Sequence, residues 1–252
     1  MLFDTHAHYD DDQFDGDRET LLASLPEQGV GLVVNPGCTV ASSRTAVELA
    51  RRFPHVYAAV GIHPENCGDF RPEDLDAIRA LAREDKVVAI GEIGLDYYWP
   101  ENPPRPLQQV LRSQLALARE LSLPVIIHDR DAHADTMAIV REFPGLRGVF
   151  HCFAGSVEMA RELVDMGWYL SFNGAATFKN ARKAPEVIRA VPMERLMIET
   201  DAPYLTPVPY RGRRNDSTYV RLVAEKIAQL RDMTPQEVEQ ATWENGKRFF
   251  GI

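Results

Sequence analysis

Short apolar runs alternate with amphipathic stretches along the chain, and this alternation restricts the possible fold more than any other feature of the sequence. Most of these runs are continuously apolar, such as Val-Val-Ala-Ile-Gly-Glu, and do not alternate with polar residues. Continuous apolar runs are typical of strands that are buried on both faces of a parallel sheet. The eight predicted strands are residues 2–5, 31–35, 56–61, 87–92, 124–128, 148–151, 168–173 and 196–200.

The segments between these runs carry apolar residues at three- and four-residue spacing, which indicates amphipathic helices. The predicted helices are residues 17–25, 41–53, 73–84, 107–121, 136–143, 157–166 and 182–191, with 218–230 and 235–249 after the last strand. This order predicts an α/β fold, a single (β/α)8 TIM barrel with extra C-terminal helices, in one domain spanning residues 1–252. A doubly wound open sheet is the alternative, but its glycine-rich first turn is absent.

Composition excludes several classes of protein. With 45% hydrophobic residues, 26% charged residues and a net charge of −9, the chain has the profile of a globular protein and is too acidic for a nonspecific nucleic-acid coat. Three cysteines cannot form a disulfide framework, and no apolar run reaches the length of a membrane span. The acidic N-terminus lacks the layout of a signal peptide, so we expect a cytoplasmic protein. A monomer is the expected default, and the proline-rich segment 100–106 is predicted to be an ordered loop.

Candidate metal ligands stand at the ends of several predicted strands. His6 and His8 are two residues apart at the end of the first strand, so their imidazoles would point to the same side. Four other ligand-type residues close later apolar runs: Glu92, His128, His151 and Asp201. Each of them alone would be an ordinary loop residue. Because the carboxyl ends of barrel strands share one face, their coincidence there predicts a metal site.

The remaining histidines are less clear from the sequence. His63, in the segment Gly-Ile-His-Pro, ends the third strand and is expected either to face the same cavity as a ligand or substrate contact, or to make a structural hydrogen bond. His55 follows Pro54 in a helix–strand loop at the opposite end and is predicted to be solvated. His133 is predicted to lie on the surface where a helix begins. The three cysteines are expected to be ordinary buried or loop thiols.

Several motifs together resemble the TatD family of metal-dependent hydrolases, within the wider amidohydrolase-like barrels. They are Phe3-Asp4-Thr5-His6-Ala7-His8, Gly61-Ile62-His63-Pro64, Gly91-Glu92-Ile93-Gly94-Leu95-Asp96-Tyr97, Pro124-Val125-Ile126-Ile127-His128, His151-Cys152-Phe153-Ala154-Gly155-Ser156, Glu199-Thr200-Asp201-Ala202-Pro203-Tyr204-Leu205 and Asn245. They extend over essentially the whole chain. Ala154 departs from the family pattern, where serine is usual, but it is not a ligand-type residue.

The resemblance implies a (β/α)8 fold with two divalent metal cations. One cation would be held by His6, His8, Glu92 and Asp201. The second would be held by Glu92, His128 and His151, so that Glu92 bridges the two. Such mixed nitrogen and oxygen ligands suit Mg, Mn, Zn or Ni and do not choose among them. Glu92 and Asp201 are then the expected catalytic residues, with Asp201 orienting or deprotonating an attacking water.

TatD-like proteins are associated with metal-dependent DNase activity, often in the 3′-to-5′ direction on single strands. The resemblance therefore implies a deoxyribonuclease or phosphodiesterase whose substrate is nucleic acid, chiefly DNA ends. A second hypothesis keeps the metals but hydrolyses an ester or amide, such as a mis-acylated tRNA. A third is a metal-stabilised interaction protein, which the full ligand set disfavours because a structural site needs no open two-metal cluster.

Substrate contacts are predicted from local charge and aromatic residues. The densest cationic patch follows Asp201 and contains Arg211, Arg213 and Arg214, whose guanidinium groups match phosphate geometry. The alternative is a solvated basic loop. The aromatic residues 97–99, just after Glu92, are expected either to stack on bases or to pack within the loop. His63, Arg211 and Arg213 are the predicted substrate-binding residues.

Overall fold

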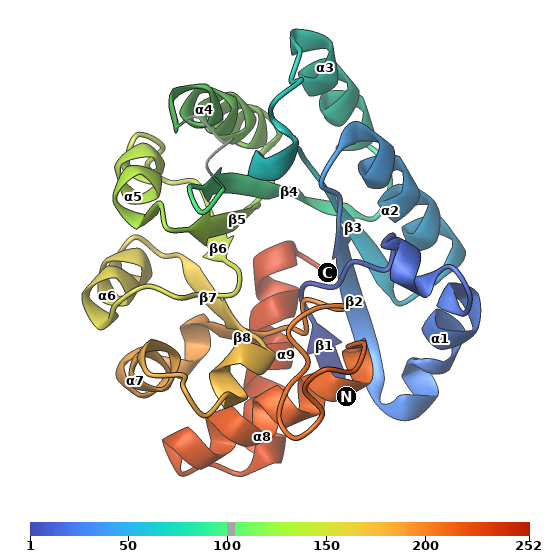
Figure 1. The fold of residues 1–252 in the computed structure, drawn as a ribbon, viewed down its shortest axis with the longest axis vertical. Coiled ribbons are helices and arrows are strands. Elements are labelled where there is room, and N and C mark those ends of the chain that lie inside the picture. Colours follow the sequence, from blue (N-terminus) through green and yellow to red (C-terminus); the bar gives the residue numbers. More distant parts are fainter. Residues whose placement is uncertain (100–103) are drawn as a thin grey trace.

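In a computed structural model that describes residues 1–99 and 104–252, eight parallel strands follow one another in sheet order β1 to β8 (Figure 1). This confirms the predicted barrel architecture. The strands are β1 Leu2–Asp4, β2 Val30–Pro36, β3 Val56–Val60, β4 Val87–Asp96, β5 Val125–Arg130, β6 Gly148–Phe150, β7 Tyr169–Phe172 and β8 Leu196–Ile198.

Helices surround the strands, and each strand leads into the helix that covers its outer face (Figure 1). The α-helices are α1 Arg18–Ser24, α2 Val40–Arg52, α3 Pro72–Leu81, α4 Pro104–Leu121, α5 His133–Arg141, α6 Val157–Asp165, α7 Lys183–Ala190, α8 Val220–Arg231 and α9 Pro235–Phe250. Short 3-10 helices are η1 Asp12–Phe14, η2 Pro26–Gln28, η3 Pro64–Asn66, η4 Gly174–Thr177, η5 Met193–Arg195 and η6 Ser217–Tyr219. No described helix is long and apolar enough to cross a membrane.

Three strands extend beyond their predicted ranges, β2 by one residue at each end and β4 and β5 at their carboxyl ends. β4 continues to Asp96 and β5 to Arg130, so their last residues are polar. The helix after β4 also begins earlier than predicted, because residues 104–106 of the proline-rich segment already belong to α4. Residues 100–103 of that predicted loop lie outside the described residues.

The C-terminal helix α9 fills one end of the barrel. It contributes Phe249 and Phe250 to an apolar cluster inside the strands that also includes Phe3 and Tyr169. Asn245 on this helix donates hydrogen bonds of 2.7 Å to two backbone carbonyls near the start of β8, which fixes the helix against the barrel. This end is therefore packed with apolar side chains, and the polar side chains collect at the opposite, carboxyl end of the strands.

The ring is joined between its first and last strands just beyond their ends. The amide of Thr5 donates to the carbonyl of Ile198, the amide of Asp201 to that of His6, and the amide of His8 to that of Ala202, at 3.2, 2.9 and 2.7 Å. These backbone bonds place the segments that carry His6, His8 and Asp201 side by side.

The fully buried carboxylate of Asp4 reinforces this junction. Its two oxygens accept hydrogen bonds from the Thr200 amide at 2.9 Å, the Thr200 hydroxyl at 2.6 Å and the Ser217 hydroxyl at 2.6 Å. One side chain on β1 thus satisfies polar groups from the loop after β8 and from η6. Because buried polar groups are costly when unpaired, this carboxylate stabilises the junction.

We predict that replacing Asp4 by alanine leaves four buried donors, on His6, Thr200 and Ser217, without this acceptor and lowers the free energy of unfolding by about 2–5 kcal/mol. Urea denaturation of the metal-free proteins measures this change. The matched control is Asp76→Ala on α3, whose side chain is 79% exposed and which should shift stability by less than about 0.5 kcal/mol. Equal stability of the two variants would show that the junction does not depend on Asp4.

Candidate metal centre

The side chains at the carboxyl ends of the strands converge on one carboxylate, that of Glu92 on β4. Its Oε1 lies 2.8 Å from His128 Nδ1 and 2.8 Å from His151 Nε2. Its Oε2 lies 3.2 Å from His6 Nε2 and 3.5 Å from His8 Nε2. Each oxygen of Glu92 therefore has a different pair of imidazole nitrogens as its nearest histidine contacts.

Asp201 joins the group on the side of Oε2. Its Oδ1 lies 3.7 Å from His6 Nε2 and 3.6 Å from His8 Nε2. All six predicted ligand residues thus meet in one cluster. The clusters that could hold a cation include His6 with His8 and Glu92, and His63 with Glu92 and His128.

The carboxylates of Glu92 and Asp201 have histidines as their ion-pair partners. Glu92 is 2% exposed, and burial by itself would raise its pKa. The charges of His151, His63 and His6 instead hold the pKa of Glu92 well below its ordinary value. No Lys or Arg among the described residues forms an ion pair with Glu92 or Asp201. Buried carboxylates ringed only by imidazoles are a donor set that fits divalent cations.

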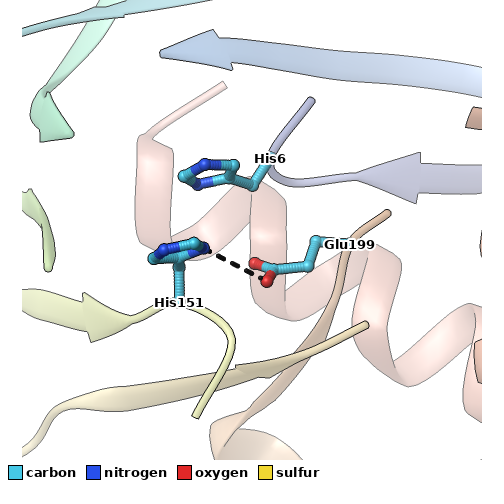
Figure 2. A group of neighbouring side chains, drawn as sticks. All are labelled: His6, His151 and Glu199. Carbon is cyan, nitrogen blue, oxygen red and sulfur yellow. Dashed lines mark ion pairs between the residues drawn. The ribbon is translucent and has the colours of Figure 1, made fainter. Parts of the chain in front are cut away.

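Carboxylates outside the cluster lie beside two of its histidines. His128 Nε2 lies 3.0 Å from Asp96 Oδ2, at the end of β4. Burial lowers the pKa of His128, but the bonds to Asp96 and Glu92 outweigh it and raise the pKa to about 9. His151 Nδ1 lies 3.4 Å from Glu199 Oε1 (Figure 2). A hydrogen-bonded carboxylate such as Asp96 fixes the ring orientation of a metal-binding histidine, whereas His151 Nδ1 is near Glu199 without making a hydrogen bond.

Glu199 is itself held in place. Its Oε1 accepts hydrogen bonds from the Cys152 amide at 2.8 Å and from Asn173 Nδ2 at 3.1 Å. The rings of His6 and His151 stack beside it, with centroids 4.0 Å apart and an interplanar angle of 9° (Figure 2). His6 Nδ1 and Glu199 Oε2 are buried and have no hydrogen-bond partner among the described residues. His6, His151 and Glu199 form a further group with cation-binding geometry.

His63 is placed at the edge of the cluster by the loop after β3. Its Nδ1 accepts a hydrogen bond of 3.2 Å from the Glu65 amide, and its Nε2 lies 3.4 Å from Glu92 Oε1. A neutral imidazole whose Nδ1 accepts a hydrogen bond carries its one proton on Nε2. His63 therefore presents an N–H donor toward the cluster, which suits a contact to a substrate oxygen.

The cluster lies at the base of a cavity of about 670 Å³. Beyond the metal-site residues, the cavity is lined by Asp10, Asp11, Cys38, Thr39, Ser42, Glu65, Asn66, Trp99, Arg130 and Tyr204. Arg130 is the one Lys or Arg among these described lining residues.

Arg211 and Arg213 do not line this cavity. They belong to a neighbouring hollow of about 350 Å³, and Tyr204 borders both spaces. The guanidinium of Arg211 lies 3.9 Å from the ring centroid of Phe178. Arg214 forms an ion pair with Asp17 at 2.6 Å, so its guanidinium already has a carboxylate partner, and its contact to phosphate stays a prediction.

The other sequence-based expectations have mixed outcomes. His55 is half-buried, with its Nε2 buried and its ring centroid 6.1 Å from that of Phe53, so it is less solvated than predicted. His133 begins α5 at the surface as expected and lies 2.7 Å from Asp129. Tyr97 packs within the loop and donates to Asp135, whereas Tyr98 and Trp99 are exposed.

Asp96, Glu199 and Arg130 are site residues that were not singled out from the sequence. Asp96 is four residues after Glu92, and Arg130 is two residues after His128. Even spacing along a strand places side chains on one face, so extending the predicted strands beyond their apolar runs would have identified both. Glu199 carries a similar signal, because it directly follows the apolar run of β8.

The chain matches known proteins over essentially its whole length. A family model described as TatD related DNase matches residues 3–251. The chain is 46% identical over 254 residues to the metal-dependent hydrolase YabD of Bacillus subtilis, with 100% of both chains covered. It is 34% identical over 261 residues to the 3′-5′ ssDNA/RNA exonuclease TatD of Salmonella typhimurium, covering 100% of this chain and 99% of that one.

Solved structures agree. The crystal structure of YjjV, a TatD homolog from Escherichia coli K12, superposes with a TM-score of 0.94 at 31% identity, covering 100% of this chain and 98% of that chain. The sequence motifs, the converging histidines and these relatives lead to the same conclusion. The chain is an enzyme and belongs to the TatD family of metal-dependent hydrolases.

Proposed function

We propose that the chain is a two-metal phosphodiesterase that removes nucleotides from the 3′ ends of single-stranded nucleic acid, chiefly DNA. The observation that carries this proposal is the position of Glu92, whose two oxygens face two separate pairs of histidine nitrogens. A carboxylate in that position would be able to hold two cations, one at each oxygen. The name of the Salmonella relative supports single-stranded DNA or RNA as the substrate class.

The distances around Glu92 support two ligand sets. His6, His8, Asp201 and Glu92 Oε2 would hold one divalent cation, and His128, His151 and Glu92 Oε1 would hold the other. The mixture of imidazole and carboxylate accommodates Mg, Mn, Zn or Ni. When bound, a pair of cations supplies Lewis acidity to the phosphoryl group and lowers the pKa of an attacking water.

The protein's own residues position the reactants. Burial raises the pKa of Asp201, but a hydrogen bond from His8 and the charges of His151 and His6 outweigh burial and lower that pKa, so the carboxylate is ionised. Asp201 borders the cavity. We assign it two roles: it orients the attacking water, and one of its carboxylate oxygens accepts the proton of that water. The Nε2–H of His63 would donate to a nonbridging oxygen of the scissile phosphate. Arg211 and Arg213 would contact the strand farther out.

A direct test offers the metal-loaded protein labelled single-stranded and duplex oligonucleotides, a mis-acylated tRNA and simple amides. Stepwise shortening of the single strand from its 3′ end supports the proposal. Selective release of the acyl group from tRNA would favour the ester-hydrolase alternative, and inactivity toward every substrate would favour a noncatalytic role.

The bridging role of Glu92 predicts that Glu92→Gln weakens both metal sites together, because a neutral amide replaces the carboxylate that both ligand sets share. Metal content per chain, measured by plasma mass spectrometry after equilibration at limiting metal, should fall at both sites. Glu65→Gln is the control, since its side chain also lines the cavity but belongs to neither ligand set. Full occupancy in Glu92→Gln would contradict the bridging role.

The role of Asp201 predicts that Asp201→Asn lowers kcat by about 10²–10⁴-fold, because the amide cannot take up the proton of the attacking water. The comparison is made at matched metal content, and circular dichroism should show an unchanged fold. Near-normal hydrolysis by Asp201→Asn under these conditions would remove it from the mechanism.

The outer arginines predict a change in salt dependence. The double variant Arg211→Ala/Arg213→Ala should raise KM for oligonucleotides and flatten the slope of log K against log salt by about 1.4, or about 0.7 for each phosphate that the variant no longer binds. Metal content and hydrolysis of nitrophenyl phosphate should not change. The exposed pair Arg119→Ala/Arg141→Ala is the charge-matched control. If hydrolysis of oligonucleotides and of nitrophenyl phosphate decreased equally, the loop that carries Arg211 and Arg213 would instead support the metal site.

A further inference from the structure

Arg130 stands at the end of β5, on the same strand as His128 and two residues beyond it. Residues two apart on a strand share a face, and both side chains line the cavity above the metal centre. The intervening Asp129 turns away and contacts His133 and Thr136 on α5. The strand therefore directs a permanent cation toward the substrate space, displaced from the cluster by about two residues' rise, or about 6.6 Å.

The guanidinium of Arg130 is held by aromatic rings. Its Cζ lies 3.7 Å from the ring centroid of Tyr98 and 5.8 Å from that of Trp99. Stacking on a ring face fixes the plane of the guanidinium and leaves its in-plane N–H donors available. An arginine oriented in this way presents a fork of donors to an anion.

The neighbouring wall of the cavity is tied to the catalytic cluster. Trp99 Nε1 donates a hydrogen bond of 2.7 Å to Glu65 Oε1, and the amide of Glu65 donates to His63 Nδ1. Trp99 as a residue is 39% exposed. The loops after β3 and β4 thus build one continuous surface from the cluster to Arg130, with an aromatic ring on which a base can stack.

We propose that Arg130 binds the substrate phosphate that lies next to the scissile one on its 5′ side, while Trp99 stacks on the base of that nucleotide. The inference rests on the proposed function and names a specificity-determining residue for it. The displacement of Arg130 along β5 is on the scale of the distance between consecutive phosphates of a single strand. With the scissile phosphate at the cluster, the next phosphate reaches Arg130.

The charge of the cavity makes this contact selective. Asp10, Asp11 and Glu65 also line it, and the chain carries a net charge of −9, so a polyanion receives no general attraction. Because Arg130 is the one permanent cation among the described lining residues, a phosphodiester strand binds favourably only when one of its phosphates contacts Arg130. A small phosphate ester, which has no second phosphate, makes no use of it.

The test pairs a protein change with a chemical change in the substrate. A short thymidine oligonucleotide is compared with one whose second linkage from the 3′ end is a neutral methylphosphonate. We expect wild-type enzyme to lose about tenfold or more in kcat/KM on the neutral linkage, because a charge-assisted bond is removed. Arg130→Ala should lose the same factor on the natural strand and nothing further on the neutral one. Arg130→Lys should retain part of the discrimination.

Arg119→Ala is the matched control, because Arg119 also lies over an aromatic ring, 5.2 Å from Phe143, but on α4 outside the cavity. It should discriminate between the two strands as wild type does. Hydrolysis of nitrophenyl phosphate and metal content should be unchanged in Arg130→Ala. Discrimination by Arg130→Ala equal to that of wild type, or an equal decrease on nitrophenyl phosphate, would overturn the inference.

The outcome also separates this inference from the proposed function. If wild-type protein cleaves no oligonucleotide, the proposed function fails, and the same two strands are compared by fluorescence anisotropy as ligands of the metal-loaded protein. Weaker binding of the methylphosphonate strand by wild type but not by Arg130→Ala would then still support the phosphate contact. Equal binding of both strands by wild type would reject it.

Discussion

The buried carboxylate of Glu92 is the group on which the architecture of the site depends. An ionised carboxylate with 2% exposure is tolerated in a protein interior only when cationic partners or donors surround it. Five histidines, from four separate regions of the chain, turn toward its two oxygens. Two further carboxylates lie on the far side of these imidazoles from Glu92: Asp96 beside His128 and Glu199 beside His151. A cluster of this kind keeps its donors ordered for cations.

The barrel supports that cluster by separating its two ends. At one end α9 packs Phe249 and Phe250 among apolar strand residues. This packing stabilises the barrel and involves no residue of the candidate metal centre. At the other end the strands stop packing apolar side chains and present ligands. Gly94 shows how closely the strands approach there, because a Cβ at this position would lie 1.9 Å from the backbone oxygen of His128. The close pairing of β4 and β5 thus holds Glu92 and His128 together.

Local sequence pattern predicted the elements because each strand and helix is a local property of periodicity and composition. The strand order and the six ligand residues follow from that pattern together with the rule that barrel strands end on one face. Strand ends were harder, because β4 and β5 continue past their apolar runs into polar residues. That shortfall concealed Asp96 and Arg130, whose side chains share a face with Glu92 and His128.

The sequence by itself determined that this chain forms an α/β barrel of the TatD family and which residues gather at its candidate metal centre. Tertiary structure alone decided how they gather: which oxygen of Glu92 faces which histidines, and which nitrogen of His63 is left to donate. It also decided that Arg214 is used in an ion pair with Asp17, whereas Arg130 borders the cavity. The physical reason is that side-chain direction and charge pairing depend on neighbours distant in the chain, and no local pattern records them.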